Sequence, residues 1–131
     1  MKKDIHIPSV SDVNVAIVFE HNELYKSDDW NVYIINEKNV AIEMLVIVSK
    51  GFDENLQTSV MRKKIDFLPA NSCAKIELMQ PELFKLNNLF QVTFFEGNQL
   101  FEKSFTFAKN SIKEGNMRMI SSLNKRGILA K

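Results

Sequence analysis

Few side chains in this sequence have the types that do chemistry, and they are scattered along the chain. Cys73 is the single cysteine, and His6 and His21 are the two histidines. Nucleophilic catalysis requires a cysteine or a serine next to a base. A hydrolase would therefore need a pocket that holds two or more of His6, His21, Cys73, Asp29 and Glu23. Their spacing matches no catalytic motif, so the sequence predicts a non-enzymatic protein.

Metal and cofactor sites need convergent ligands, and the sequence does not space its candidate ligands for that purpose. Zinc takes three or four His, Cys or carboxylate ligands, and neither histidine has a partner at such a spacing. The glycines Gly51, Gly97, Gly115 and Gly127 are far apart, whereas a phosphate-binding loop needs several together. We therefore expect no metal and no cofactor.

Two groups of basic residues are candidates for contact with a partner. The first is the run 62–64, and the second is the segment 109–131, which has six Lys and Arg residues against one Glu. The net charge of the whole chain is +1, so no global field attracts an anionic partner. The segment 109–131 either docks on the body of the protein, contacts a protein partner or binds nucleic-acid phosphates. The candidate contact residues are Arg62, Lys63, Lys64, Lys113, Arg118, Lys125 and Arg126.

The elements that position these residues are predicted by apolar residues at every second position, the period of a β-strand. The segment 40–48 is apolar at both parities, so we expect a central strand covered on both faces. The segment 58–67 carries the cations 62–64, and exposed charge is typical of an edge strand. A loop is expected at 50–55, and a helical turn opens at Pro81. The predicted strands are 13–20, 30–35, 40–48, 58–67, 73–79, 89–96 and 100–107.

The order of these elements predicts an all-β fold, because short strands follow one another without crossover helices. We expect an antiparallel β-sandwich of about seven strands with a phenylalanine-rich interior, and Gly97-Asn98 forms the turn of its clearest hairpin. Over residues 13–107 this arrangement resembles immunoglobulin and fibronectin type III sandwiches. The Cys…Trp…Cys framework is missing, and Phe90 stands where the tyrosine corner of an immunoglobulin domain would be.

The C-terminal segment differs in character from the body of the chain. We assign residues 1–108 to the sandwich domain and residues 109–131 to a basic tail that docks or binds a partner. The spacing of Ser111 and Glu114 is that of a helix capping box, whereas Gly115 and Asn116 are poor helix formers. The sequence of this tail is compatible with a short helix and equally with an ordered coil that lies on the sandwich.

The start of the chain, residues 1–8, has basic residues but no apolar run, so it does not predict a signal peptide. The longest unbroken apolar stretch, 44–48, is far shorter than the ~18 residues of a membrane span. We therefore expect a single-domain cytoplasmic protein that does not enter a membrane.

Several stretches, at 29–36, 48–53, 92–95 and 127–131, resemble a small uncharacterised bacterial family of similar length. Its members are sometimes labelled phenylalanyl-tRNA synthetase related. A class II synthetase needs paired arginines on a large sheet to hold ATP, and the arginines here are Arg62, Arg118 and Arg126. The resemblance therefore implies an accessory protein, not an aminoacylating enzyme.

Together these features favour a binding or structural module that contacts another protein. A homodimer through a sheet edge is one form of that contact. The alternative is an RNA- or tRNA-linked accessory protein that uses the basic tail.

Overall fold

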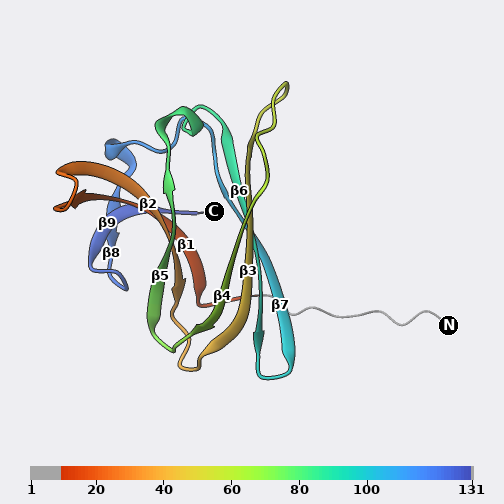
Figure 1. Cartoon of the computed structure of the whole chain (residues 1–131). Helices are drawn as coiled ribbons and strands as arrows, with labels where there is room; N and C mark the ends of the chain where they lie inside the picture. Colours follow the sequence, from red (N-terminus) through yellow and green to blue (C-terminus); the bar gives the residue numbers. More distant parts are fainter. Residues whose placement is uncertain (1–9, 131) are drawn as a thin grey trace.

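Two antiparallel sheets face each other in the computed structural model, which describes residues 10–130 (Figure 1). One sheet has the strand order β5-β2-β1-β9-β8, and the other has the order β4-β3-β6-β7. Two 3-10 turns, η1 (Pro81–Leu83) and η2 (Glu114–Asn116), lie between strands. The strands are β1 (Val13–Asn22), β2 (Ser27–Asn36), β3 (Ile42–Phe52), β4 (Met61–Leu68), β5 (Ser72–Met79), β6 (Asn87–Glu96), β7 (Gln99–Phe107), β8 (Arg118–Ile120) and β9 (Lys125–Leu129).

The predicted antiparallel β-sandwich is confirmed, and its seven expected strands correspond to β1–β7. Some bounds differ from the expectation. The loop expected at 50–55 is shorter, because β3 continues to Phe52 and pairs there with the start of β6. Gly51 permits this continuation, since a Cβ atom at that position would lie 3.2 Å from the Leu86 side chain. The helical turn at Pro81 is present as η1.

The interior between the sheets is rich in phenylalanine, as the alternation in the β6–β7 hairpin predicts. The rings of Phe90 and Phe107 meet edge to face with centroids 5.8 Å apart, a favourable arrangement for aromatic pairs. Apolar side chains of β1 and β2 meet them from the other sheet. The residues of these four strands that are buried between the sheets are Val13, Val15, Ile17, Val32, Ile34, Phe90, Val92, Phe94, Phe105 and Phe107.

The strand that is covered on both faces is β1, and the expectation of such coverage for residues 40–48 was wrong. β3 is central in its sheet, between β4 and β6, but Met44 on it is 64% exposed. Nothing in residues 10–130 packs over the outer face of that sheet. On β1, both Val15, which faces the other sheet, and Ala16, which faces outward, are fully buried.

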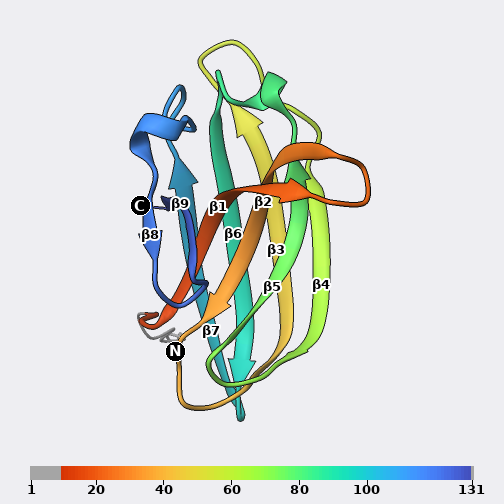
Figure 2. The ribbon, with the colours of Figure 1, turned by 90° about the vertical axis from the view of Figure 1, so that its left-hand side faces the viewer.

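The C-terminal tail covers β1, and apart from the short 3-10 turn η2 its regular structure is a β-hairpin, which neither of the two expected alternatives contained. After η2 it forms the hairpin β8–β9, which adds to the free side of β1 (Figure 2). Ile120 and Leu123 of this hairpin pack on the outward side chains of Ala16 and Val18. The predicted capping box does not form, because the Ser111 hydroxyl donates a hydrogen bond to the carbonyl of Ala108 instead.

Gly127 allows the hairpin to approach β1. It pairs with Val18 on one side and with Arg118 on the other. A Cβ atom at this position would lie 2.5 Å from the carbonyl oxygen of Ile17. The absence of a side chain therefore permits the backbone contact that joins the tail to the sheet.

Candidate functional site

The run Arg62-Lys63-Lys64 lies on β4, at an edge of the four-stranded sheet, as the sequence predicts. β4 pairs with β3 and with no other strand of residues 10–130. In this register Arg62 is opposite Val48, Lys63 opposite Ile47 and Lys64 opposite Val46. Because Ile47 faces the interior, Lys63 is on the inward side of β4, and its two neighbours are on the outward side.

An inward lysine on an edge strand opposes the addition of a further strand, since pairing would enclose its charge. The acidic group that it faces is Glu77 of β5, which is half-buried between the sheets. Glu77 accepts a hydrogen bond from the Ser49 hydroxyl at 3.4 Å. Burial raises the pKa of Glu77, and this hydrogen bond and the charge of Lys63 offset part of the rise.

β4 also exposes apolar side chains beside its cations. Met61 is 59% exposed and Phe67 is 55% exposed. Large apolar side chains next to arginine are typical of surfaces that contact proteins, where Met, Phe and Arg are enriched. The edge strand therefore combines positive charge with apolar contact area.

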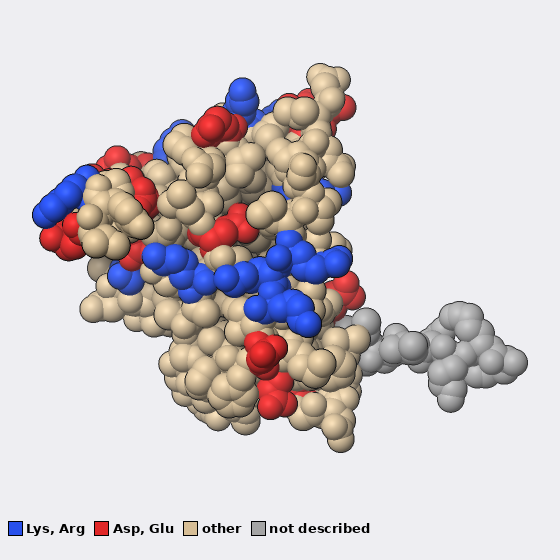
Figure 3. Space-filling model, viewed as in Figure 1, with Lys and Arg blue, Asp and Glu red and all other residues tan. Residues whose placement is uncertain are grey.

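A band of Lys and Arg crosses the face of the molecule that carries β5 and β4 (Figure 3). Lys75 of β5 is exposed and lies opposite Tyr33. Lys125 of β9 pairs with Glu20, to which the Tyr33 hydroxyl donates, so it lies on the same sheet face as Lys75. We use the name basic band for these two lysines together with the cations of β4: Arg62, Lys63, Lys64, Lys75 and Lys125.

Glu20 of β1 forms the ion pair that positions Lys125, the residue of the basic band that lies on β9. One carboxylate oxygen accepts hydrogen bonds from the Tyr33 hydroxyl at 2.6 Å and from Asn31 at 2.8 Å, and the other is 2.9 Å from Lys125 Nζ. Burial raises the pKa of Glu20, but the bonds from Tyr33, Lys125 and Asn31 outweigh it and lower the pKa below its ordinary value. The same cluster raises the pKa of Tyr33, through burial and through its bond to Glu20. This cluster ties β9 to β1 and β2.

The structure brings together only part of the candidate contact set. Arg62, Lys63 and Lys64 are adjacent, and Lys125 is placed at the far end of the same band. Of the remaining candidates, Lys113 precedes η2, Arg118 lines a cavity, and Arg126 is exposed on β9.

Lys75 is a band residue that the sequence analysis did not select. The alternation of Ala74 and Ile76 with Cys73 and Lys75 is the signal that could have placed its side chain outward. The alternation did not show that β5 lies beside β4. These two strands are edges of different sheets, and the packing of one sheet on the other cannot be read from alternation along a strand.

Of the side chains singled out for catalysis, the structure brings only His21 and Glu23 together among residues 10–130, and they lie at the surface. His21 at the end of β1 lies 3.0 Å from Glu23 in the turn and 2.9 Å from Asp28 at the start of β2, and all three are exposed. Asp29 is further along β2, where it accepts a hydrogen bond from the Ser27 hydroxyl. His6 lies outside the described residues.

Cys73 is exposed on β5, away from that turn. Partial burial raises the pKa of its thiol, and the charge of Glu20 adds to this effect, while Lys125 opposes it. A raised pKa lowers the thiolate fraction, which is the nucleophilic form. No group of three His, Cys, Asp or Glu side chains within residues 10–130 could hold a metal ion.

Two cavities open at the surface, and neither contains His21, Cys73, Asp29 or Glu23. One, of about 690 Å³, lies between β7 and the β8–β9 hairpin. The other, of about 170 Å³, lies beside Asn36 and Ser72.

Comparison of the chain with protein-family models, with curated proteins and with solved structures finds no match. Neither helical turn in residues 10–130 has the length and apolar character of a membrane-spanning helix. The relation to a synthetase-labelled family stays a prediction from the sequence.

Proposed function

We propose that this chain is a non-enzymatic protein-interaction domain of the cytoplasm, which binds an acidic partner through β4 and the basic band. The observation that carries the proposal is the composition of β4. Three consecutive cations share this edge strand with the exposed side chains of Met61 and Phe67. Opposite charge on a partner would steer the encounter, and the apolar side chains would supply buried contact area.

The partner is a protein of different sequence, and the contact is made by side chains. Two β4 edges paired in parallel and in register, or antiparallel about Lys63, would place Arg62, Lys63 and Lys64 against the same residues of a second copy. Like charges directly opposite each other across strands are destabilising. The inward Lys63 further opposes strand addition. These features disfavour a homodimer through β4.

The alternative, an RNA-linked accessory protein that uses the tail, has weaker support. RNA-binding sheets present aromatic side chains for base stacking, but Phe90, Phe94 and Phe105 are buried between the sheets. Lys109 and Lys125 of the tail already pair with Glu54 and Glu20. Of the tail cations within residues 10–130, Lys113, Arg118 and Arg126 then remain for contacts with phosphates.

Site-specific photocrosslinking in the cell that makes the protein tests the proposal. The photoreactive residue p-benzoylphenylalanine is placed at Met61 in one chain and at Tyr25 in a control chain. Tyr25 is 75% exposed on the β1–β2 turn, so it samples chance encounters. We expect a defined protein adduct from Met61 and none from Tyr25.

Charge reversals in the Met61 crosslinking chain separate the band from the tail. Arg62→Glu with Lys64→Glu should abolish the adduct, whereas Lys113→Glu with Arg126→Glu should leave it unchanged. Equal adducts at Met61 and Tyr25 would contradict the proposal. An adduct that nuclease digestion removes, and that depends on Lys113 and Arg126, would support the RNA alternative.

A further inference from the structure

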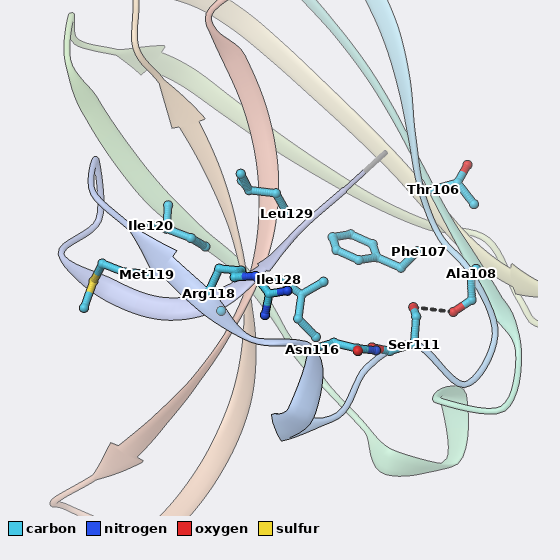
Figure 4. A pocket seen from close by; sticks show the side chains of 11 residues that line it. Thr106, Phe107, Ala108, Ser111, Asn116, Arg118, Met119, Ile120, Ile128 and Leu129 are labelled. Atoms are coloured by element: carbon cyan, nitrogen blue, oxygen red, sulfur yellow. Dashed lines mark hydrogen bonds between the residues drawn. The ribbon is translucent and has the colours of Figure 1, made fainter.

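The cavity between β7 and the β8–β9 hairpin is separate from the basic band. Its lining comes from the end of β7, the connecting segment after it and both strands of the tail hairpin (Figure 4). The volume of about 690 Å³ is within the range of small-molecule sites, about 300–1,000 Å³. It lies at the flank of the sandwich where the sheets do not close on each other, because β7 is the last strand of its sheet.

The wall of the cavity is apolar. Phe107 is buried, and Ile128 is half-buried against the same core between the sheets. Leu129 and Met119 are exposed at the opening, at 48% and 62%. A hydrocarbon body that entered this space would remove its own surface and the exposed parts of Ile128 and Leu129 from water, which is favourable.

Polar groups gather on one side of the cavity, where Arg118, Asn116 and Ser111 lie near one another (Figure 4). Asn116 donates a hydrogen bond to the carbonyl of Ser111 at 2.8 Å, and the Ser111 hydroxyl donates to the carbonyl of Ala108. These bonds fix the segment after β7 around the cavity. They also leave Arg118 as the charged group of the lining.

The Arg118 guanidinium has spare hydrogen-bonding capacity. It has five N–H donors, and one of its terminal nitrogens, Nη1, donates to the carbonyl of Met117 at 3.2 Å. No Asp or Glu belongs to the lining, and no carboxylate of residues 10–130 forms an ion pair with Arg118. The cavity therefore has one fixed positive charge beside an apolar wall.

We propose that this cavity binds a small amphipathic carboxylate. The carboxylate pairs with the planar fork of the Arg118 guanidinium, which matches its geometry. The hydrocarbon body lies against Phe107 and Ile128. A single positive charge and a mostly apolar lining select a ligand with one negative charge over a highly charged phosphate ester or a cation.

Titration of the full chain with decanoate, followed by NMR of methyl groups, tests the proposal. We expect saturable shifts of the Ile128 and Leu129 methyl signals and unchanged signals from Leu24 and Leu56. Leu24 and Leu56 are 80% and 53% exposed, so they report unspecific association. 1-Decanol, which has the same chain length and no charge, should bind at least about tenfold more weakly, since it cannot form the charge-assisted bond.

Two matched variants assign the charge recognition. Arg118→Gln should weaken decanoate binding about tenfold or more and leave 1-decanol binding unchanged, whereas Arg126→Gln on the neighbouring strand should have no effect. The amide spectra of the unliganded variants must match that of the original chain, which establishes that both are folded.

Three results would overturn the proposal. These are the absence of saturable methyl shifts, equal affinity for decanoate and 1-decanol, and equal weakening by the two arginine variants. The crosslinking experiment at Met61 is independent of all three, so failure of one proposal does not imply failure of the other.

Discussion

Gly127 is the residue at which the structure depends most directly on the absence of a side chain. Its backbone is in contact with β1, and a Cβ atom would be 2.5 Å from the Ile17 carbonyl oxygen. A backbone atom in a paired strand cannot move aside as a flexible side chain can.

We predict that Gly127→Ala lowers the free energy of unfolding by about 1–3 kcal/mol, the cost of forcing extra volume into a packed site. Gly115→Ala is the control, because a Cβ atom there meets nothing within 4 Å, and it should change the free energy by less than about 0.5 kcal/mol. Denaturant unfolding measures both values. Equal stability of the two variants would show that β9 is not held against β1 as described.

The free energy of unfolding depends on pH through the titration of Glu77. Its pKa in the folded protein is raised above the ordinary value of 4.5, first by burial, so the native state binds its proton more tightly than the unfolded chain does. The stabilisation from protonated Glu77 is fully present below the unfolded pKa and is lost as the pH rises through the folded pKa.

Glu77→Gln removes this titration and should keep a polar partner for Ser49. We therefore predict that the variant gains stability relative to the original chain as the pH rises from about 4 to 7. Glu114→Gln, at an exposed glutamate, should show no such trend. Denaturant midpoints across this pH range measure the difference, and a constant difference would contradict the account.

At the scale of elements, the tail hairpin stabilises the sheet that it joins. Leu123 is 8% exposed and packs over β1, whereas Met119 in the same hairpin is 62% exposed. We predict that Leu123→Ala costs about 2 kcal/mol or more, and that Met119→Ala costs less than about 0.5 kcal/mol. Similar costs for both would mean that the hairpin does not cover β1 in solution.

This packing changes how the tail can be studied. Removal of residues 109–131 would expose Ala16, Val18 and Ile35, which are buried in the complete chain. A truncated chain would therefore lose stability together with any contact that the tail makes. Point variants of exposed cations such as Lys113 and Arg126 separate binding from folding.

At the scale of the whole molecule, one core joins both sheets, so the chain should unfold in a single transition. Trp30 is the single tryptophan, and its ring lies 4.7 Å from that of Phe19 and 5.7 Å from that of Phe84. We predict that Trp30 fluorescence and far-UV circular dichroism give coincident denaturation curves. A separate early transition by circular dichroism would show that the tail hairpin opens independently.

Local sequence was enough to predict the strands β1–β7. Alternating apolar residues predicted β1–β7, the phenylalanines of β6 and β7 predicted the interior, and the cations of β4 predicted an edge. These predictions succeeded because side-chain direction along a strand depends on the strand's own residues.

The position of the tail, the face of β4 that Lys63 occupies and the place of the cavity depend on contacts between distant segments of the chain. β8 and β9 are three and five residues long, too short for an alternation to stand out. The pairing of β9 with β1 depends on a free edge more than 100 positions earlier in the chain and on the close approach at Gly127. Such contacts are properties of the assembled sheets, and the cavity beside Arg118 exists because β7 and the tail hairpin come from different sheets that do not meet.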